Sequence, residues 1–337
     1  MKLSSIKKIK VTLQNVYDIT VPTTAQFFAD NILVHNCMEI SIPSIPYTSA
    51  QDFYVKEESD GEVGFCSIGG INVARMLPFE YEKYAYCLVK TINILIDKAP
   101  MLTASMRHDI RKRRSLGIGM LGLADLLYKQ DRLYADHEYI EEIAERHYYW
   151  LLKASQRLVE EGHYPAVEGI KTDWLPIDTK RSEKEPTMDW ESLRGKSRAN
   201  SVLVAHMPTE TSSQFSNAYN GLYPARSTVI MKESRTGRVL FIGAPVKELA
   251  WDISNNVIAK MYQVVQGYTD QAVSADYYVV PNRYEDGKVP LSVLMKEWVY
   301  QARLGNKTMY YSNTLDNNGG LFKADDSAGC DSGGCTL

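Results

Sequence analysis

The chain has 337 residues, of which 45% are hydrophobic and 23% are charged, and its formal net charge is −3. This composition is that of ordinary folded domains, and it excludes an intrinsically disordered or collagen-like chain. The 38 Lys and Arg residues nearly balance the 41 Asp and Glu residues, so no field of the whole chain favours a nucleic-acid partner.

Short β segments are expected in the first 36 residues. The apolar runs that predict them are residues 6–13, 16–21, 27–29 and 32–34, and turn-forming residues such as Pro22 separate them. So short a stretch cannot bury a core of its own. We therefore expect a small all-β piece that depends on other parts of a protein.

Helical periodicity dominates the middle of the chain. In residues 78–98, Leu88, Ile92 and Leu95 share one face of a predicted helix, and a second helix is predicted at residues 137–161. Further runs predict strands at 201–205 and 239–243 and helices at 246–266 and 291–304. Strands that alternate with helices indicate an α/β fold with a parallel sheet.

No apolar run is long enough to cross a bilayer, which takes about 20 residues. The best candidate, residues 87–99, is interrupted by Lys90, Asp97 and Lys98. Lysines also interrupt the first ten residues, where a signal peptide has an apolar core. Five cysteines, an odd number, argue against a secreted disulfide framework. We expect a cytoplasmic protein that binds no membrane.

The last 26 residues, 312–337, differ from the rest, because 15 of them are Gly, Ser, Asn or Asp. Such a segment buries too little apolar surface to order itself, so we expect a disordered tail. Cys330 and Cys335 lie in this tail, and the four residues between them let the two thiols close a small disulfide ring. A redox dithiol is favoured over the alternative, a zinc site, because no second Cys or His pair lies nearby.

His35, Asn36 and Cys37 form a candidate self-cleaving junction. The side-chain amide of Asn36 can attack its own backbone carbonyl, which closes a succinimide and cuts the peptide bond that follows. His35 is placed to donate a proton to that carbonyl, and the thiol of Cys37 can accept an acyl group. By themselves, these three residues more often mark an ordinary loop.

The segment up to this junction closely resembles the C-terminal fragment of an intein. VYDITV matches the penultimate block of that family and FFADNILVHN matches its last block. The resemblance implies that Asn36 cyclises, that His35 assists, that Asp18 is the acid of the penultimate block and that Cys37 begins the C-extein. The start of the chain fits a naturally split intein.

One departure from the intein pattern concerns the last block. Ala25 and Gln26 stand where many inteins carry His-Asn ahead of the Phe pair. We therefore expect splicing that is slower or that relies on other groups.

Two further pairs of residues carry chemistry. Cys37 and Glu39 put a thiol and a carboxylate two positions apart, on the same side of an extended backbone, where the carboxylate can move a proton. Tyr310 and Tyr311 are adjacent phenols, which can pass an electron and a proton or simply pack.

A hydroxyl-rich turn follows the strand predicted at 201–205. Such a turn at the start of a helix can collect a phosphate through hydroxyls and backbone N–H groups, or it can only cap the helix. The turn consists of Thr209, Glu210, Thr211, Ser212 and Ser213.

Several motifs beyond the junction follow one another in the order and approximate spacing of one family. They are Cys37 with Glu39, Cys66 in GEVGFCSIGGIN, RRSLGIGMLG, MPTETSSQFSNAYNG, KTMYYSNT and GCDSGGC. Together they resemble the C-terminal part of the large (alpha), catalytic subunit of class Ia ribonucleoside-diphosphate reductase. The resemblance covers essentially all of residues 37–337.

The two resemblances together imply three parts. Residues 1–36 are expected to form a small all-β intein (Hint-type) fragment. Residues 37–311 are expected to form the C-terminal half of a ten-stranded α/β barrel, with Cys37 on a loop inside it. Residues 312–337 are expected to be a flexible redox tail.

The reductase resemblance also implies residue roles. Cys37 becomes the thiyl radical that takes the 3′ hydrogen of the ribose, and Glu39 handles the proton of the 3′-hydroxyl. Cys66 supplies one of two reducing thiols, and the turn at 209–213 binds the substrate phosphates.

The remaining roles concern radical and electron transfer. Tyr310 and Tyr311 relay the radical to Cys37, and Cys330 and Cys335 re-reduce the active-site disulfide. The reach of a flexible tail of this length, roughly 25 Å, is enough for that movement.

Partners and cofactors follow from the same resemblance. The expected partners are an N-terminal reductase and intein fragment, a small (beta) radical-generating subunit, thioredoxin or glutaredoxin, and ribonucleoside diphosphates. We expect no metal site and no cofactor bound by this chain. The radical comes from the metal-tyrosyl cofactor of the small subunit, and allosteric nucleotides, ATP among them, bind the missing N-terminal part.

Two alternatives remain. The halves could associate without ligation, so that the reductase is a non-covalent complex. The glycine string at residues 117–122 fits the G-x-G-x-x-G pattern of nicotinamide enzymes, but the residues before it are polar and predict no strand. Cys87 is expected to be an inert core thiol, and the basic run at 111–114 to be a solvated or subunit-facing surface.

Overall fold

The computed structural model describes residues 26–29, 32–35, 38–54, 61–101, 103–179, 184–234 and 237–315. Within these ranges, side chains are described from residue 38 onward, apart from those of residues 232–239. The described residues fall into two units. Strands β1 and β2 belong to the first unit, and residues 38–315 belong to the second.

The first unit contains one described pair of strands. β1 (Gln26–Ala29) runs antiparallel to β2 (Ile32–His35), with Gln26 opposite His35. The strands predicted at these positions are confirmed. The two β segments predicted earlier in the chain lie outside the described residues.

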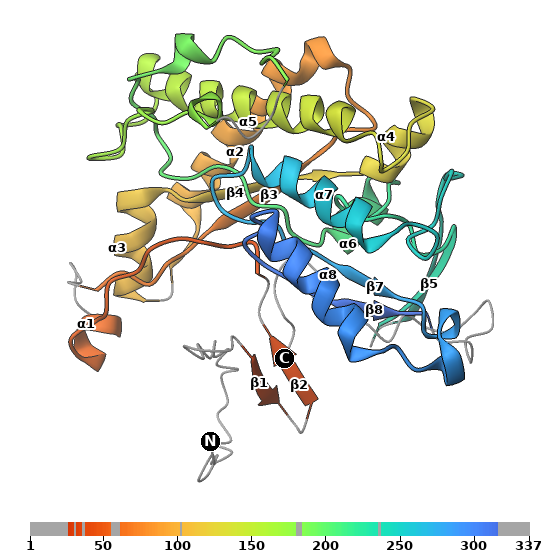
Figure 1. Cartoon of the computed structure of the whole chain (residues 1–337). Coiled ribbons are helices and arrows are strands. Elements are labelled where there is room, and N and C mark those ends of the chain that lie inside the picture. The colour runs from red at the N-terminus through yellow and green to blue at the C-terminus, as the bar shows by residue number, and fades with distance from the viewer. Residues whose placement is uncertain are drawn as a thin grey trace. The chain divides into compact units, whose positions relative to one another are not determined.

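Parallel strands form the centre of the second unit (Figure 1). β3 (Ser67–Asn72) pairs in parallel with β4 (Leu116–Leu121). β7 (Tyr277–Val279) pairs in parallel with β8 (Ser312–Thr314). The six residues of β4 are all buried, as expected for a strand covered on both faces.

Two extended segments lie between these pairs of strands. The amides of Leu116 and Ile118 in β4 donate to the carbonyls of Val202 and Leu203 at 3.0 and 2.8 Å. His206 then bridges Val273 in parallel. The parallel arrangement therefore continues from β3 through residues 202–206 and 271–275 to β8, and the predicted α/β class with a parallel sheet is confirmed. The half-barrel stays a prediction.

The strand predicted at 201–205 is wrong as a regular element. The amides of Leu203 and Val204 donate to the carboxylate of Asp270, both at 2.8 Å, instead of to a neighbouring strand. Because a side chain takes the place of the ladder partner on that side, the segment is extended but forms no regular strand.

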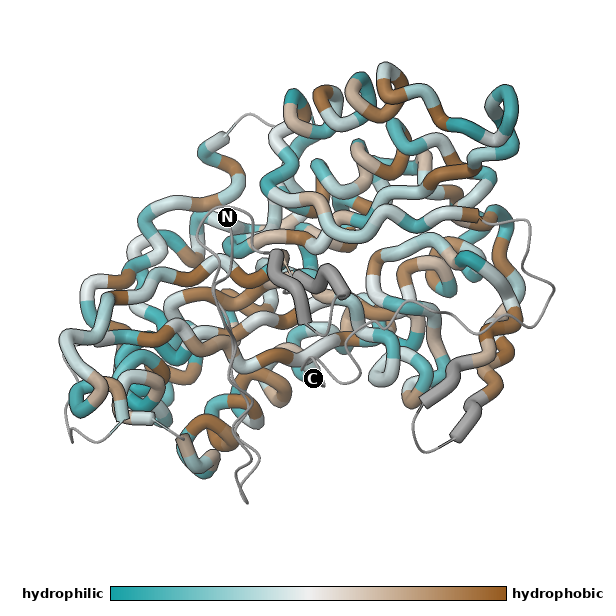
Figure 2. Tube along the Cα trace, turned by 90° about the horizontal axis from the view of Figure 1, so that it is seen from below, coloured by the Kyte–Doolittle hydropathy of each residue, from teal (hydrophilic) through white to brown (hydrophobic). Residues whose placement is uncertain are grey.

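Long helices pack beside the strands. Figure 1 shows α2 (Tyr81–Lys98) and α5 (His137–Glu160) on one side of β3 and β4. α5 also contacts α7 (Asn255–Gln266), and α7 contacts α8 (Leu291–Arg303). Figure 2 shows hydrophobic positions recurring along the coiled parts of the trace with hydrophilic ones between them, as in amphipathic helices.

Shorter elements complete the second unit. They are α1 (Ala50–Tyr54), α3 (Ala104–Arg113), α4 (Leu123–Lys129), α6 (Glu210–Phe215), the antiparallel strands β5 (Val229–Ser234) and β6 (Gly237–Ile242), and 3₁₀ turns at Pro78–Glu80, Pro176–Asp178, Trp190–Leu193, Pro281–Arg283 and Glu285–Gly287.

Several element predictions need correction. The helix predicted from residue 246 begins at Asn255, because the hydroxyl of Ser254 caps it by accepting from the Asn256 amide at 3.3 Å. Cys87 is exposed and is no core thiol, since Ala85 and Val89 are the buried neighbours on α2.

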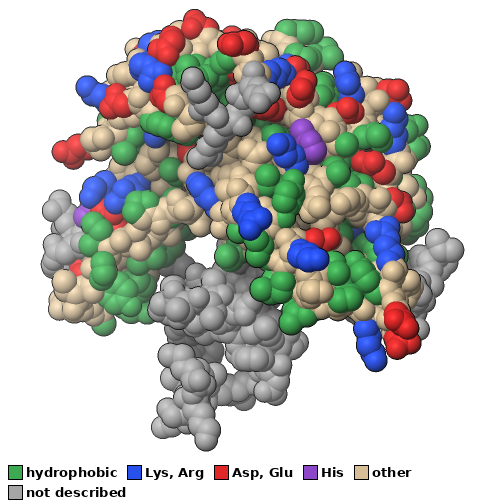
Figure 3. All heavy atoms as spheres, in the orientation of Figure 1, with side chains coloured by type: hydrophobic (Ala, Val, Ile, Leu, Met, Phe, Trp, Pro, Cys, Tyr) green, Lys and Arg blue, Asp and Glu red, His purple; other side chains and the backbone are tan. Residues whose placement is uncertain are grey.

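The basic run at 111–114 is neither solvated throughout nor free of partners. Arg113 forms an ion pair with the buried Glu62. Arg114 is buried and donates to Asn93 and Asp97 at 2.7 and 2.8 Å. On the face drawn in Figure 3, acidic and basic side chains are interspersed.

The predicted tail also begins too early, since Ser312–Thr314 is β8. Asn313 in this strand is buried and donates to Asp276 at 2.9 Å, which a composition argument cannot detect. Residues 316–337 lie outside the described part. Among the described helices, none has the length and apolar character that crossing a membrane requires.

Candidate functional site

One segment, residues 271–277, lies beside four of the predicted site residues, Glu39, Cys66, Tyr310 and Tyr311. The Ala272 amide donates to the backbone carbonyl of Glu39 at 2.9 Å. Further along, the Tyr310 amide donates to the carbonyl of Ala275 at 2.8 Å, and Tyr277 donates to the carbonyl of Tyr311 at 2.7 Å. The segment therefore brings together residues that are more than 260 positions apart in the sequence.

The carboxyl group of Glu39 is buried, with 3% of the residue exposed. The hydroxyl of Ser274 donates to it at 2.5 Å and accepts from the Met38 amide at 3.1 Å. Burial raises the pKa of Glu39 above its ordinary value, and the hydrogen bond from Ser274 partly opposes this rise. Glu39 is therefore a fixed carboxyl group with an increased affinity for a proton.

Tyr223 holds Ser274 through a hydrogen bond to its backbone. Its hydroxyl donates to the backbone carbonyl of Ser274 at 2.7 Å. Tyr223 is itself buried and lies edge-on to Tyr262, with ring centroids 6.5 Å apart. Tyr223 thus holds the backbone of Ser274, whereas the Ser274 hydroxyl contacts residues 38 and 39.

Cys66 immediately precedes β3, and its sulfur lies above β4. A Cβ placed on Gly117 would be 3.0 Å from this sulfur and 3.5 Å from Cδ1 of Ile40, so the missing side chain at position 117 leaves room for both. The side-chain nitrogen of Gln271 lies 3.5 Å from the sulfur. Burial raises the pKa of the Cys66 thiol to about 12, so it is protonated at neutral pH.

Tyr310 and Tyr311 are in ring contact. Their centroids are 3.9 Å apart, with an angle of 47° between the ring planes. The Tyr311 amide donates to a carboxylate oxygen of Asp276 at 3.3 Å. The pair is therefore tied through its backbone to residues 275–277.

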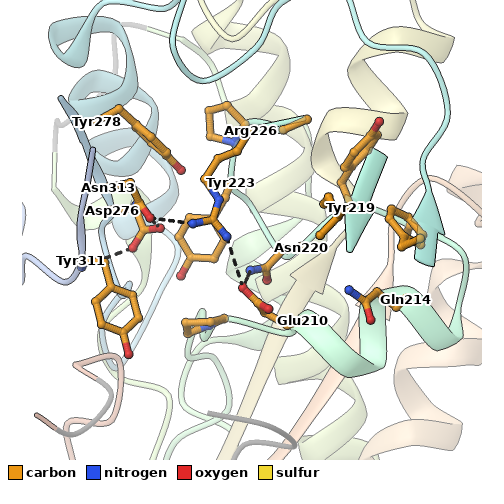
Figure 4. Close-up of a pocket in the computed structure, with 16 residues that line it drawn as sticks. Glu210, Gln214, Tyr219, Asn220, Tyr223, Arg226, Asp276, Tyr278, Tyr311 and Asn313 are labelled. Atoms are coloured by element: carbon orange, nitrogen blue, oxygen red, sulfur yellow. Dashed lines mark hydrogen bonds and ion pairs between the residues drawn. The ribbon is translucent and has the colours of Figure 1, made fainter. Parts of the chain in front are cut away.

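A network of polar side chains continues from Asp276 (Figure 4). Asn313 donates to Asp276 at 2.9 Å and accepts from Arg226 at 2.9 Å. Figure 4 shows Arg226 reaching from Asn313 on one side to Glu210 on the other, where the ion-pair distance is 3.7 Å. Burial raises the pKa of Asp276 to about 7, although the hydrogen bond from Asn313 and the charge of Arg226 oppose the rise.

A cavity beside this network is lined by aromatic side chains. Tyr219, Tyr223, Tyr278 and Tyr311 contribute to its wall, together with Glu210 and Arg226 of the polar network. Figure 4 shows these residues arranged around it. Tyr311 of the tyrosine pair and Glu210 of the predicted phosphate turn therefore border the same cavity.

Residues 210–213 of the predicted turn belong to the short helix α6, and Thr209 is its N-cap. The hydroxyls of Thr209 and Ser213 lie 2.7 Å apart, and the Gly221 amide donates to Thr209 at 2.8 Å. Thr209 and Ser213 are buried, whereas Thr211 and Ser212 are exposed. The Thr209 side chain makes no capping bond to α6, so the alternative of a simple helix cap is not supported.

Residues 117–121 of the glycine string lie within strand β4, and Gly122 follows the strand as the N-cap of α4. A Cβ on Gly119 would lie 3.0 Å from the carbonyl oxygen of Ala205, so this glycine permits close packing of two backbones. A dinucleotide fingerprint needs a loop whose amides face a phosphate. The nicotinamide alternative is therefore wrong for these glycines.

Some predicted residues cannot be placed. Asp18, Asn36, Cys37, Cys330 and Cys335 lie outside the described residues, and the backbone of His35 ends β2 while its side chain is not described. In the described part, no group of three or more His, Cys, Asp and Glu side chains could hold a metal ion.

Sequence reasoning missed the polar side chains that organise the site. Gln271, Ser274 and Asp276 lie in the stretch DQAVSADYYVV, where polar residues interrupt an otherwise apolar run. That interruption is the signal that could have found them, because a buried polar side chain needs a partner. Nothing in the local sequence indicates that Arg226 reaches Asn313.

Comparison with known proteins gives a consistent result. Residues 29–249 match the family model described as "Ribonucleotide reductase, barrel domain". The ribonucleoside-diphosphate reductase subunit alpha of Haemophilus influenzae is 34% identical over 89% of this chain, and that of Enterobacteria phage T4 is 29% identical over 87%. Ribonucleoside-diphosphate reductase 1 subunit alpha of Escherichia coli is 35% identical over 67% of this chain. The chain spans 42%, 42% and 33% of the lengths of these relatives, respectively.

Proposed function

Because this chain belongs to the ribonucleotide reductase barrel-domain family, we propose that it is the catalytic C-terminal portion of a class Ia ribonucleoside-diphosphate reductase large subunit. It acts in an assembly with the missing N-terminal portion, since it spans less than half of its relatives. The observation that carries the proposal is the 271–277 segment, which contacts Glu39 and Cys66 at one end and the tyrosine pair at the other.

The proposed chemistry reduces a ribonucleoside diphosphate to the deoxyribonucleoside diphosphate. A sulfur radical on Cys37 removes the 3′ hydrogen atom, Glu39 accepts the 3′-hydroxyl proton, and the 2′-hydroxyl takes up a proton and leaves as water. At the end of the cycle Cys37 returns the hydrogen atom to C3′ and Glu39 returns the proton to the 3′ oxygen. Cys66 and a second thiol on the N-terminal portion supply two electrons and become a disulfide. The raised pKa of Glu39 suits a group that takes up and returns a proton.

The raised pKa of Cys66 supports its part in this scheme. A thiol that stays protonated delivers hydrogen together with the electron, whereas a thiolate would act as a nucleophile. The fixed position of the sulfur above Gly117, next to Ile40, puts it near the segment that follows Cys37.

Substrate binding is proposed at the turn formed by residues 209–213. Thr211 and Ser212 are exposed there, and the buried Thr209 and Ser213 brace the turn through their mutual hydrogen bond. The exposed hydroxyls and amides are suited to the phosphates of a nucleoside diphosphate.

Radical and electron transfer complete the proposal. Tyr310 and Tyr311 relay the radical from a small subunit, whose metal-tyrosyl cofactor generates it. Cys330 and Cys335 reduce the active-site disulfide and are reduced by thioredoxin or glutaredoxin. The ring contact of the two tyrosines supports the relay.

The N-terminal unit is proposed to be the C-terminal fragment of a split intein. Splicing with an N-terminal fragment then joins the two halves of the reductase at Cys37. The antiparallel pair β1 and β2, which ends at His35, supports a β-rich fragment next to the junction. Incubation with the N-terminal fragment tests this: a ligated product that has lost the intein mass is expected, and unligated halves under reducing conditions would favour the non-covalent complex.

Turnover of the reconstituted reductase tests the main proposal. Tyr310→Phe removes the oxidisable hydroxyl but keeps the ring. Nearly all of the product formation that requires the small subunit is therefore expected to be lost. Tyr128→Phe is the matched control, because Tyr128 is an exposed residue of α4 outside the site. Equal turnover of the two variants would contradict a radical relay.

A further inference from the structure

The side chain of Gln271 contacts three separate segments. It is fully buried, with 0% of the residue exposed. Its nitrogen donates to the carbonyl of Leu116 at 2.8 Å and lies 3.5 Å from the Cys66 sulfur, and its oxygen accepts from the Ser41 amide at 3.1 Å. One amide group therefore joins the start of β4, the Cys66 thiol and the residues that follow Cys37.

The orientation of this amide follows from its partners. The carbonyl of Leu116 can only accept a hydrogen bond, and the backbone amide of Ser41 can only donate one. The nitrogen of Gln271 must therefore face Leu116 and the oxygen must face Ser41. The second N–H of that nitrogen is then directed at the sulfur of Cys66, which acts as the acceptor.

The charges around Cys66 give this hydrogen bond a particular weight. Asp270, Glu39 and Asp109 are all acidic, and each disfavours a negative charge on the sulfur. Burial acts in the same direction, and the hydrogen bond from Gln271 opposes both effects. Gln271 thus acts on the thiol itself and does not merely fill space beside it.

We propose that Gln271 is a positioning residue, which holds the Cys66 sulfur and the residue 38–41 segment in a fixed relation through a single amide. The proposal rests on the proposed reductase function for its catalytic meaning, because there the Cys66 thiol and the chemistry at Cys37 and Glu39 act on one substrate. Without the amide, the thiol and that segment lose their fixed relation. The rate of the chemical step is therefore expected to fall more than the affinity for substrate.

Alkylation of Cys66 in the full 337-residue chain measures the hydrogen bond directly. Trypsin releases Cys66 in the peptide 57–75 and Cys87 in the peptide 84–90, so mass spectrometry follows the two thiols separately in one digest. The thiolate is the species that reacts with iodoacetamide. Gln271→Met keeps the length of the side chain but removes the donor, and it is expected to slow alkylation of Cys66 at pH 9 about tenfold.

Two further variants separate the hydrogen bond from packing. Gln271→Glu keeps an oxygen for Ser41 but places a negative charge by the sulfur, so it is expected to slow alkylation more than Gln271→Met. Gln156→Met is the matched control, because Gln156 is also a buried glutamine with two hydrogen bonds from its nitrogen. The control is expected to leave Cys66 unchanged, and Cys87 serves as the internal reference in every sample.

Unchanged or faster alkylation of Cys66 in the Gln271 variants would show that Gln271 only fills space. If Gln271 only packs, its replacement loosens the site and exposes the sulfur, so alkylation of Cys66 stays equal or becomes faster, which overturns the proposal. Should neither variant fold, hydrogen exchange of the native chain decides instead. Methylthiolation of Cys66 is then expected to speed exchange of the Ser41 amide relative to the Phe65 amide, which bonds Asp109 at 2.9 Å, and equal exchange overturns the proposal.

Turnover of the reconstituted enzyme supplies the functional arm. Gln271→Met is expected to lower kcat at least tenfold with KM changed less than twofold. A raised KM with unchanged kcat would contradict the positioning role. An inactive wild-type assembly would count against the proposed function, while the alkylation result would still decide whether Gln271 binds the thiol.

Discussion

The two ends of the 271–277 segment hold their neighbours in different ways. At the first end, the neutral side chains of Gln271 and Ser274 bind Cys66 and Glu39. At the second end, Asp276 belongs to a network with Asn313 and the charged Arg226 and Glu210. Burial is the main cause of the raised pKa of Glu39 and of Cys66, and nearby carboxylates add to it at Cys66, whereas the charged network restrains the backbone of the tyrosine pair.

The difference suits two kinds of task. A group that exchanges a proton or a hydrogen atom needs an ionisation state that burial can shift, and both pKa values at the first end are raised. A pair of rings that must stay in contact needs a fixed backbone instead. Charge-assisted hydrogen bonds, which are stronger than neutral ones, provide that restraint at the second end.

The largest expected effect comes from the carboxyl group at the first end. Glu39→Gln keeps the bond to Ser274 but removes the base, so turnover of the reconstituted reductase is expected to fall about 10²–10⁴-fold. Glu145→Gln is the control, because Glu145 is equally buried but accepts from Thr187 and Trp190 away from the site. It should lower the melting temperature while the folded enzyme keeps its kcat. Unchanged turnover in Glu39→Gln would remove the proton-transfer role.

A second test concerns the charged end. Burial raises the pKa of Asp276 from 3.8 to about 7, so the folded chain keeps a proton that the unfolded chain releases between about pH 4 and 7. Stability therefore falls as the pH rises through this window. In Asp276→Asn this contribution is absent, and the difference in unfolding free energy between variant and wild type is expected to change by about 4 kcal/mol from pH 4 to pH 8. Urea unfolding at both pH values measures it, and parallel profiles would contradict it.

The third test returns to the neutral end. Ser274→Ala removes the donor to Glu39, so the pKa of Glu39 is expected to rise further. The acid limb of the kcat/KM profile should then move to higher pH, with a rate on that limb roughly threefold to tenfold lower than that of the wild type. A uniform loss of rate at all pH values would show that Ser274 only packs.

The smallest effect is expected from a change at Tyr223, which bonds the backbone of Ser274. Tyr223→Phe removes the hydrogen bond to the Ser274 carbonyl and should cost about 1 kcal/mol of stability. Tyr219→Phe is a matched control, since its hydroxyl also donates to a backbone carbonyl, that of Ala244 at 2.6 Å. Both should lose similar stability in urea unfolding, but a shift of the Glu39 acid limb is expected only for Tyr223→Phe.

The sequence predicted those features that depend on local pattern. The helices over 81–98, 137–160 and 291–303 follow from apolar periodicity, and the site residues Glu39, Cys66, Tyr310 and Tyr311 were all identified from motifs. These four residues do meet one segment of the structure.

The features that escaped prediction depend on pairing between distant residues. The irregular 201–205 segment results from the carboxylate of Asp270, and the order of β8 results from its pairing with β7. Gln271 and Ser274 belong to no motif, because the partners of their side chains lie more than 150 positions away. Local periodicity holds no information on such contacts.

The glycine at position 117 has a consequence for how mutations in this protein are interpreted. An added methyl group there would meet the Cys66 sulfur at 3.0 Å and Cβ of Ala205 at 3.2 Å. In alanine scanning, replacement of glycine by alanine is usually taken to be harmless. At this position, however, the added methyl group would be too bulky. Tolerance to variation is therefore expected to be low at this position, although its residue contributes no functional group, and natural variants there should be judged by volume and not by polarity.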